Sequence, residues 1–143
     1  MLKTDKPVCL ITGLGDGTGG FTARRFAKAG YRIAMIARTR ERLIKFEKEL
    51  LGSKGYVCDV SDLTVLENTC KKIKDEMGAP QILIHNAVKG NFEYLLNGKP
   101  EWLEKNFRIN TTSLMYLAHF LIPDMLDNNK AVSYTHLTLP TKA

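Results

Sequence analysis

The chain has 143 residues, a length that provides for one domain with a single hydrophobic core. Its composition, 44% hydrophobic and 25% charged, is that of an ordinary globular protein, and no apolar run approaches the roughly 20 residues that a membrane span requires. The formal net charge of +6 suggests a nucleic-acid partner, but basic residues alternate with acidic ones in residues 38–43 and 71–76. We interpret these segments as solvated helix faces and expect neither a nucleic-acid nor a membrane partner.

Nothing in the composition indicates a metal centre or an exported protein. Cys9, Cys58 and Cys70 form no Cys-x-x-Cys pair and no His/Cys cluster with metal-ligand spacing, so we expect reduced structural thiols and no metal site. The first seven residues are polar and differ from a signal peptide, and we therefore expect a cytoplasmic location.

Apolar runs of strand length alternate along the chain with longer segments of 3.6-residue periodicity. The strands are expected at Val8–Thr12, Tyr31–Ala37, Tyr56–Val60 and Gln81–Asn86. The helices are expected at Gly17–Ala29 with Phe21 on the buried side, at Arg40–Leu51 with Leu51 in the apolar stripe, at Asp62–Met77 with Ser61 as cap, and, after a loop over Val88–Lys99, from Pro100 to about Leu126. This alternation predicts an α/β fold, a Rossmann-type doubly wound parallel sheet that is incomplete, with about four to five strands.

A glycine-rich loop joins the first expected strand to the first expected helix. Residues 8–20 read VCLITGLGDGTGG, with five glycines among the eight residues from 13 to 20. Glycine lets the backbone turn sharply and approach a pyrophosphate, and the helix that follows points free N–H groups and its positive dipole end at the anion. The loop therefore predicts a dinucleotide-binding site, and the alternative is a glycine-rich turn without a ligand.

Four motifs follow one another at intervals that resemble the short-chain dehydrogenase/reductase family: Thr12-Gly13-x-x-x-Gly17-x-Gly19, Asp59-Val60, His85-Asn86-Ala87 and Asn110. The resemblance covers residue 7 to about residue 126. It implies that the chain is the N-terminal, cofactor-binding part of an NAD(P)-dependent oxidoreductase. Such an enzyme transfers a hydride between its cofactor and a small carbonyl or alcohol substrate, and the resemblance implies that the intact protein is a homo-oligomer.

The resemblance also implies which residues bind the cofactor. They follow the ends of the first four strands, and they are Gly13, Gly15, Asp16, Gly17, Thr18, Gly19, Arg38, Asp59, Val60, Asn86 and Ala87. The residues of the glycine-rich loop would cradle the pyrophosphate, Asp59 and Val60 would contact the adenine ring, and Asn86 and Ala87 would support the sheet beside the ribose.

Two polar residues lie where the family places functional ones. Asn110 matches the catalytic asparagine, whose backbone distorts its helix and helps to hold a proton-relay water; the alternative is an asparagine in mid-helix that faces solvent. His85 replaces the first asparagine of a motif that usually reads Asn-Asn-Ala-Gly, and Val88 replaces its glycine. We interpret His85 as a strand-end residue hydrogen-bonded to backbone rather than as a proton-transfer group.

The end of the second strand indicates which cofactor is preferred. Family members that bind NAD place an acid there, whereas this chain has Ala37-Arg38. A planar guanidinium suits the 2′-phosphate of NADP through charge-assisted hydrogen bonds, so we expect NADP, with NAD as the second choice. Asp16 argues against this, because NADP-binding relatives often carry a basic residue at that position.

The family's chemistry depends on a serine and a Tyr-x-x-x-Lys motif that follow the long helix, and the chain has neither; Tyr134, for example, is followed four residues later by Thr138. Residues 132–143 resemble a translated sequencing adapter. We therefore expect a Rossmann domain over residues 1–131, a non-native tail over residues 132–143, a parent protein that continues, and a fragment that is inactive alone. Because residues 131–137 are β-prone, we expect them to pair beside the fourth strand.

Two functions from other classes remain open. A non-catalytic dinucleotide-binding or sensing module would explain the missing tyrosine without truncation. A methyltransferase also has a glycine-rich loop after its first strand, but it usually requires an acid at the end of the second strand, where this chain has Arg38.

Overall fold

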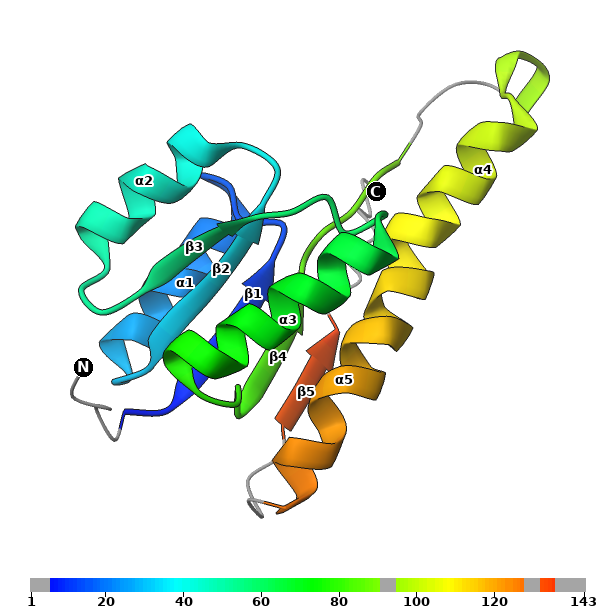
Figure 1. The fold of residues 1–143 in the computed structure, drawn as a ribbon. Helices are drawn as coiled ribbons and strands as arrows, with labels where there is room; N and C mark the ends of the chain where they lie inside the picture. The colour runs from blue at the N-terminus through cyan, green and yellow to red at the C-terminus, as the bar shows by residue number, and fades with distance from the viewer. Residues whose placement is uncertain (1–5, 91–94, 128–131, 136–143) are drawn as a thin grey trace.

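The computed structural model describes residues 6–90, 95–127 and 132–135, and a single parallel sheet forms its centre. The strands are β1 (Val8–Thr12), β2 (Arg32–Ala37), β3 (Lys54–Val57), β4 (Ile82–His85) and β5 (Val132–Thr135). Their order across the sheet is β3-β2-β1-β4-β5 (Figure 1). The expected doubly wound α/β fold is confirmed, and so is the pairing of the last segment with the fourth strand, in register Ile84 to Tyr134.

Helices cover both faces of this sheet. Helices α1 (Thr18–Lys28) and α2 (Arg40–Glu49) lie on one face, and α3 (Leu63–Met77) and α5 (Ser113–Asp127) lie on the other. Helix α4 (Pro100–Phe107), which follows a short 3₁₀ turn at Leu95–Asn97, extends beyond the sheet and continues into α5 through a π-helical segment, η2 (Arg108–Thr112) (Figure 1). Among the helices of the described residues, none combines the length and apolar character needed to cross a membrane.

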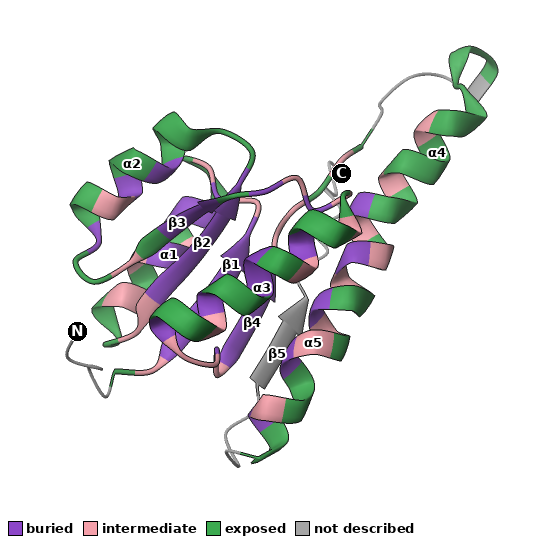
Figure 2. Cartoon of the chain, viewed as in Figure 1, coloured by how far each residue is buried: buried purple, intermediate pink, exposed green. Residues whose placement is uncertain are grey.

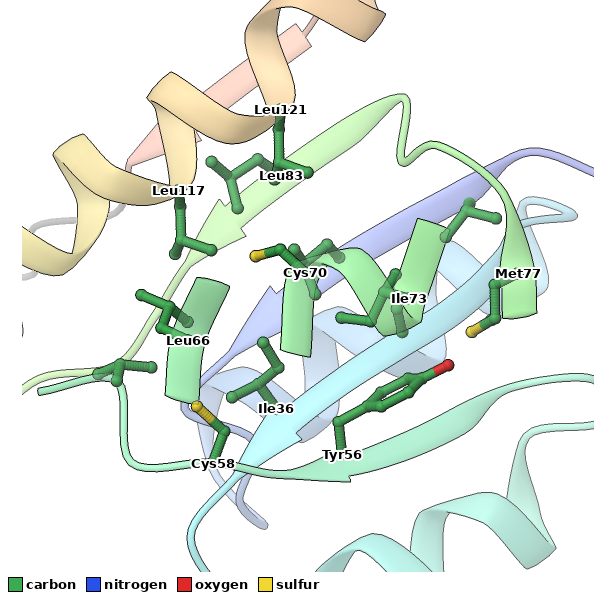
Figure 3. Packing of buried hydrophobic residues seen from close by; sticks show 14 of the residues in the cluster. Ile36, Tyr56, Cys58, Leu66, Cys70, Ile73, Met77, Leu83, Leu117 and Leu121 are labelled. Atoms are coloured by element: carbon green, nitrogen blue, oxygen red, sulfur yellow. The ribbon is translucent and has the colours of Figure 1, made fainter. Parts of the chain in front are cut away.

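Each face of the sheet has its own hydrophobic cluster, because successive strand side chains point to opposite faces. Leu10, Ile36 and Leu83 pack with Leu117 and Leu121 of α5 and with the apolar side of α3 (Figure 3). On the other face, Cys9, Ile11, Ile33 and Met35 pack against α1 and against Leu43 and Phe46 of α2. Strands β1 and β4 are therefore buried along their whole length and β2 is buried from Ile33 onward (Figure 2), which explains their apolar runs.

The third strand and the helix after it differ from the prediction. Strand β3 begins at Lys54, and Gly55 pairs with Met35. Glycine at this position lets α2 pack closely on the strand, because a Cβ at Gly55 would lie only 2.6 Å from the Cβ of Leu43. Ser61 does not cap α3: its backbone N–H and hydroxyl both donate to Asp59. The cap is Asp62, whose carboxylate accepts from the Val65 N–H at 3.0 Å.

Two hydrophobic residues predicted to be buried are exposed instead. Phe21 is 70% exposed because α1 presents Gly19, Gly20 and Ala23 to the sheet, where small residues allow close approach. Leu51 is 97% exposed because α2 ends at Glu49, so its apolar stripe stops before that position.

Candidate functional site

A cavity of about 380 Å³ opens at the carboxyl ends of the strands. It lies at the point where the strand order reverses. The chain runs from β1 outward to β2 and β3 and then returns to form β4 on the other side of β1. Crevices of this kind bind ligands in open α/β sheets. Seven of the predicted cofactor residues line it, and they are Gly13, Gly15, Arg38, Asp59, Val60, Asn86 and Ala87.

The glycine-rich loop is packed too closely to accept side chains at three of its positions, Gly13, Gly19 and Gly20; a Cβ at Gly20 would clash with the Gly15 carbonyl oxygen. Gly13 has a φ of +69°, and a Cβ there would lie 2.5 Å from the Cα of Ala87. A Cβ at Gly19 would lie 2.7 Å from the Gly13 carbonyl oxygen, which also accepts a hydrogen bond from Nδ2 of Asn86 at 2.9 Å. The first turn of α1 and the loop after β4 thus enclose Gly13 and fix the shape of the corner.

The start of α1 is open to solvent and suited to an anion. Gly17 is the residue that precedes the helix, and no atom lies within 4 Å of the place where its Cβ would be. The first turn of α1 contains no acidic side chain, and Gly17 provides no side-chain hydrogen bond to the free N–H groups. These groups and the helix dipole are therefore available to a phosphate. Three predicted cofactor residues form the start of α1 and do not line the cavity itself; they are Gly17, Thr18 and Gly19.

The acidic residue of the loop lies outside the cavity. The carboxylate of Asp16 accepts a hydrogen bond from Nζ of Lys45 in α2 at 2.6 Å, and both side chains are largely exposed. The hydrogen bond and the charge of Lys45 lower the pKa of Asp16 below its usual value. The negative charge that argued against NADP is thus paired with a cation that was not anticipated from the sequence.

Two arginines line the cavity beyond the ends of β2 and β3. Arg38 directly follows β2, and Arg42 lies one helical turn later in α2, with a guanidinium nitrogen 4.0 Å from the Cβ position of Gly15. Arg40, between them, instead bonds Glu47 at 3.1 Å and the Gly55 carbonyl oxygen. Arg42 was not predicted from the sequence, although its spacing of four residues from Arg38 near a helix start indicates the same face.

Asp59 lies two residues after the end of β3, close enough to Arg38 for an electrostatic interaction. Partial burial acts to raise its pKa, but hydrogen bonds from Ser61 and the positive charges of Arg38 and Lys105 outweigh this and lower it below the usual value. Asp59 is therefore a carboxylate at neutral pH and a hydrogen-bond acceptor at the cavity wall.

The other end of the cavity is formed by Val88, Lys89 and Ile109. Asn110 holds this end together, because its Oδ1 accepts from the Lys89 N–H at 2.8 Å and its Nδ2 donates to the Lys89 carbonyl oxygen at 2.9 Å. Asn110 therefore does not face solvent. It lies inside the π-helical segment η2, so the distortion that the family resemblance implied at this residue is present.

His85 is the centre of a buried hydrogen-bond network beneath the cavity. Its Nδ1 lies 2.8 Å from the Thr12 hydroxyl, which in turn accepts from the Ala87 N–H at 3.3 Å. Its Nε2 lies 3.1 Å from the carbonyl oxygen of Ile109. These partners assign a neutral ring that accepts at Nδ1 and donates at Nε2. The interpretation of His85 as a hydrogen-bonded strand-end residue agrees with this geometry.

Burial of His85 makes the stability of the fold depend on pH. Desolvation lowers the pKa of His85 below its usual value, whereas the unfolded chain titrates near about 6.5. As pH falls below that value, the unfolded state takes up a proton that the folded state refuses, and the free energy of unfolding decreases by up to about 1.4 kcal/mol per pH unit. Urea titrations between about pH 7.5 and 5.5 should show this slope, and His85→Gln should reduce it. An equal slope in the variant would contradict the assignment.

The cysteines and acidic residues provide no second chemical centre in the described residues. No group of three or more His, Cys, Asp or Glu residues is arranged to hold a metal ion there. Cys9, Cys58 and Cys70 are buried free thiols, and burial raises the pKa of Cys9 to about 12 and that of Cys70 to about 11. They are therefore protonated and unreactive at neutral pH.

Comparison with known proteins agrees with this fold. The profile of the short chain dehydrogenase family matches residues 7–132. Short-chain dehydrogenase/reductase 3 of Homo sapiens is 29% identical over 123 residues, which are 82% of this chain and 41% of the relative. Estradiol 17-beta-dehydrogenase 11 of Macaca fascicularis is 30% identical over 126 residues, 85% of this chain and 42% of the relative. The chain thus spans less than half the length of these relatives.

Solved structures show the same architecture. A metagenomic short-chain oxidoreductase in complex with NADP matches with a TM-score of 0.87 and 23% identity, over 96% of this chain and 64% of that one. An alcohol dehydrogenase from the archaeon Thermococcus sibiricus, complexed with 5-hydroxy-NADP, matches with a TM-score of 0.83 and 26% identity, over 90% and 57% of the two chains.

Proposed function

The chain belongs to the short-chain dehydrogenase family, and from this premise we propose that its cavity binds NADP and that it is the N-terminal, cofactor-binding part of an oxidoreductase. The observation that carries the proposal is the corner at Gly13, where a positive φ and a backbone contact with Ala87 exclude any side chain. Such a corner lets main-chain N–H groups approach a pyrophosphate, and the open start of α1 at Gly17 adds its dipole.

We assign NADP rather than NAD from the charges at the end of β2. Arg38 and Arg42 both line the cavity, and Asp16, whose charge would oppose a phosphate, is paired with Lys45. Two guanidinium groups suit the 2′-phosphate of NADP, which NAD lacks. Two neighbours, the metagenomic oxidoreductase and the archaeal alcohol dehydrogenase, were solved with NADP or a derivative of it, which supports the assignment.

In this proposal each part of the cavity has one task. The loop from Gly13 to Gly19 cradles the pyrophosphate, Asp59 and Val60 contact the adenine, and Asn86 and Ala87 support the ribose. When bound, NADPH supplies a hydride from its nicotinamide ring. We propose Asn110 as the catalytic asparagine that helps to hold a proton-relay water; the Lys89 loop that it fastens forms the wall at that end. The substrate is a small carbonyl or alcohol compound.

A second candidate is a non-catalytic dinucleotide-binding or sensing module, and the observation in its favour is that the sequence contains no Tyr-x-x-x-Lys motif. Both candidates require the nucleotide, whereas a methyltransferase requires S-adenosylmethionine. Titrations of the protein with NADPH and with S-adenosylmethionine, followed by nucleotide and tryptophan fluorescence, separate these classes. We expect saturable binding of NADPH only. Binding of S-adenosylmethionine in its place would contradict the proposal.

We also expect the 143-residue chain to bind the cofactor without turning over a substrate. In this family the lysine of a Tyr-x-x-x-Lys motif lowers the pKa of the tyrosine from about 10 so that it can act as general acid, and the printed sequence contains no such motif. NADPH oxidation with a panel of aldehydes and ketones should therefore match the rate without protein. Carbonyl reduction well above that background would contradict the prediction.

A further inference from the structure

Helix α4 and helix α5 are joined by a segment in which one backbone carbonyl has lost its usual donor. In an α-helix, the N–H of Ser113 would donate to the carbonyl oxygen of Ile109, four residues earlier. In η2 it donates instead to the carbonyl oxygen of Arg108, five residues earlier. The Ile109 carbonyl is thereby released from this bond, in a residue that is only 6% exposed.

Two side chains replace that donor. The Ser113 hydroxyl donates to the Ile109 oxygen at 2.6 Å, and His85 approaches the same oxygen with Nε2 at 3.1 Å. The histidine comes from β4, so it is a tertiary contact, whereas the serine belongs to the next turn of the same helix. A buried carbonyl without a donor costs free energy, so these bonds favour the π-helical backbone over a regular α-helix.

The π-helical backbone determines where Asn110 lies. Asn110 directly follows Ile109, and its amide binds both backbone groups of Lys89. The π-helical turn contains about one residue more than an α-helical turn. If the segment became a regular α-helix, the residues on one side of it would rotate about the helix axis by about 100° relative to the sheet. Ile109, Lys89 and Val88 form one end of the cavity, and that end is therefore connected through His85 to Thr12 at the end of β1.

We propose that His85 is a positioning residue: its bond to the Ile109 carbonyl holds the π-helical segment and thereby the cavity wall against which the nicotinamide half of NADP binds. This inference rests on the proposed function. The wall lies beyond the end of β4, whereas Arg38 and Asp59 lie beyond the ends of β2 and β3. Strands β2 and β4 are two strand spacings of about 4.8 Å apart, so the wall and the arginines are at opposite ends of the cavity. The adenine half of NADP therefore binds at the end of the cavity with Arg38 and Asp59. Only the nicotinamide half reaches the wall that His85 positions.

The test compares a whole cofactor with its adenine half. NADPH and adenosine 2′,5′-bisphosphate are titrated by calorimetry into the wild-type protein and into His85→Phe, which keeps a ring of similar size without nitrogen atoms. We expect the variant to bind NADPH about tenfold more weakly and the bisphosphate within about twofold of wild type. Ser113→Ala keeps the bond from Nε2 of His85 to the Ile109 carbonyl but removes the serine hydroxyl, which lies 3.3 Å from the same nitrogen, and it should weaken NADPH binding by about threefold.

Ile84→Ala provides the matched control, because Ile84 precedes His85 in β4, is buried, and belongs to the cluster on the opposite face of the sheet. It should lower the melting temperature and leave both affinities unchanged. Unchanged NADPH affinity in His85→Phe, or equal weakening of both ligands, overturns the inference. Failure of the wild-type protein to bind either ligand contradicts the proposed function itself, so the two failures are distinguishable.

Discussion

Gly13→Ala is expected to destabilise the protein by about 3 kcal/mol or more and to abolish NADPH binding. The new methyl group would sit at a φ of +69° and 2.5 Å from the Cα and the backbone nitrogen of Ala87, so neither a rotamer change nor a side-chain movement can relieve the contact. The loop after β4 would have to move away and would break the bond from Asn86 to the Gly13 carbonyl. Urea denaturation and an NADPH titration measure the two effects.

Gly30→Ala separates the strain of the backbone from the steric contact. Gly30 has a φ of +95°, but no atom lies within 4 Å of its Cβ position, so only the left-handed conformation is penalised. We expect a loss of about 1 kcal/mol and normal NADPH binding. If Gly13→Ala destabilised the protein no more than this control, the close packing of Gly13 on Ala87 would not be essential to the site.

Arg38→Ala is expected to weaken NADPH binding by about 10- to 100-fold while changing NADH binding by less than about twofold. In the proposed site the guanidinium binds the 2′-phosphate, which only NADPH carries. Arg42→Ala should act in the same direction with a smaller effect, because Arg42 lies farther along α2 and lines the same cavity. Parallel fluorescence titrations with both nucleotides measure the ratio directly.

Arg40→Ala is the matched control for charge. It removes one positive charge from the same helix turn, but its guanidinium is bonded to Glu47 and to the Gly55 carbonyl rather than to the cavity. Its NADPH affinity should stay within about twofold of wild type, apart from screened long-range effects. An Arg38→Ala variant that lost NADPH and NADH binding equally would remove the assignment of NADP.

The sheet and the first part of the site could be predicted because their signals are local. A strand buried on both faces is a continuous apolar run, as in Val8–Thr12. The closely spaced glycines that follow it predict a sharp turn with close backbone approach. The strands β2, β3 and β4 run parallel in one sheet, so topology alone brings the residues after their ends, Arg38, Asp59 and Asn86, to the same edge.

Other features depend on contacts between distant segments and have no local signal. The family resemblance implied a helix distortion at Asn110, but the donors that replace the lost bond, His85 from β4 and Ser113 from the next turn, could not be predicted from residues 100–126 alone. The pairing of Asp16 with Lys45 depends on how α2 lies beside the glycine loop. The start of β3 at Lys54 depends on Gly55 fitting against Leu43, which a propensity for turns at glycine does not reveal.

In the proposed site the backbone of the β1–α1 corner binds the diphosphate of a dinucleotide. Amide resonances of the isotope-labelled protein, followed during titration with NADPH, report on this contact residue by residue. We predict saturable shifts that are largest at Gly13, Gly15 and Gly17 and weaker at residues of β3 and α3 away from the cavity. A well-dispersed spectrum of a folded protein in which these glycine resonances stay in place at millimolar NADPH and NADH would contradict the account.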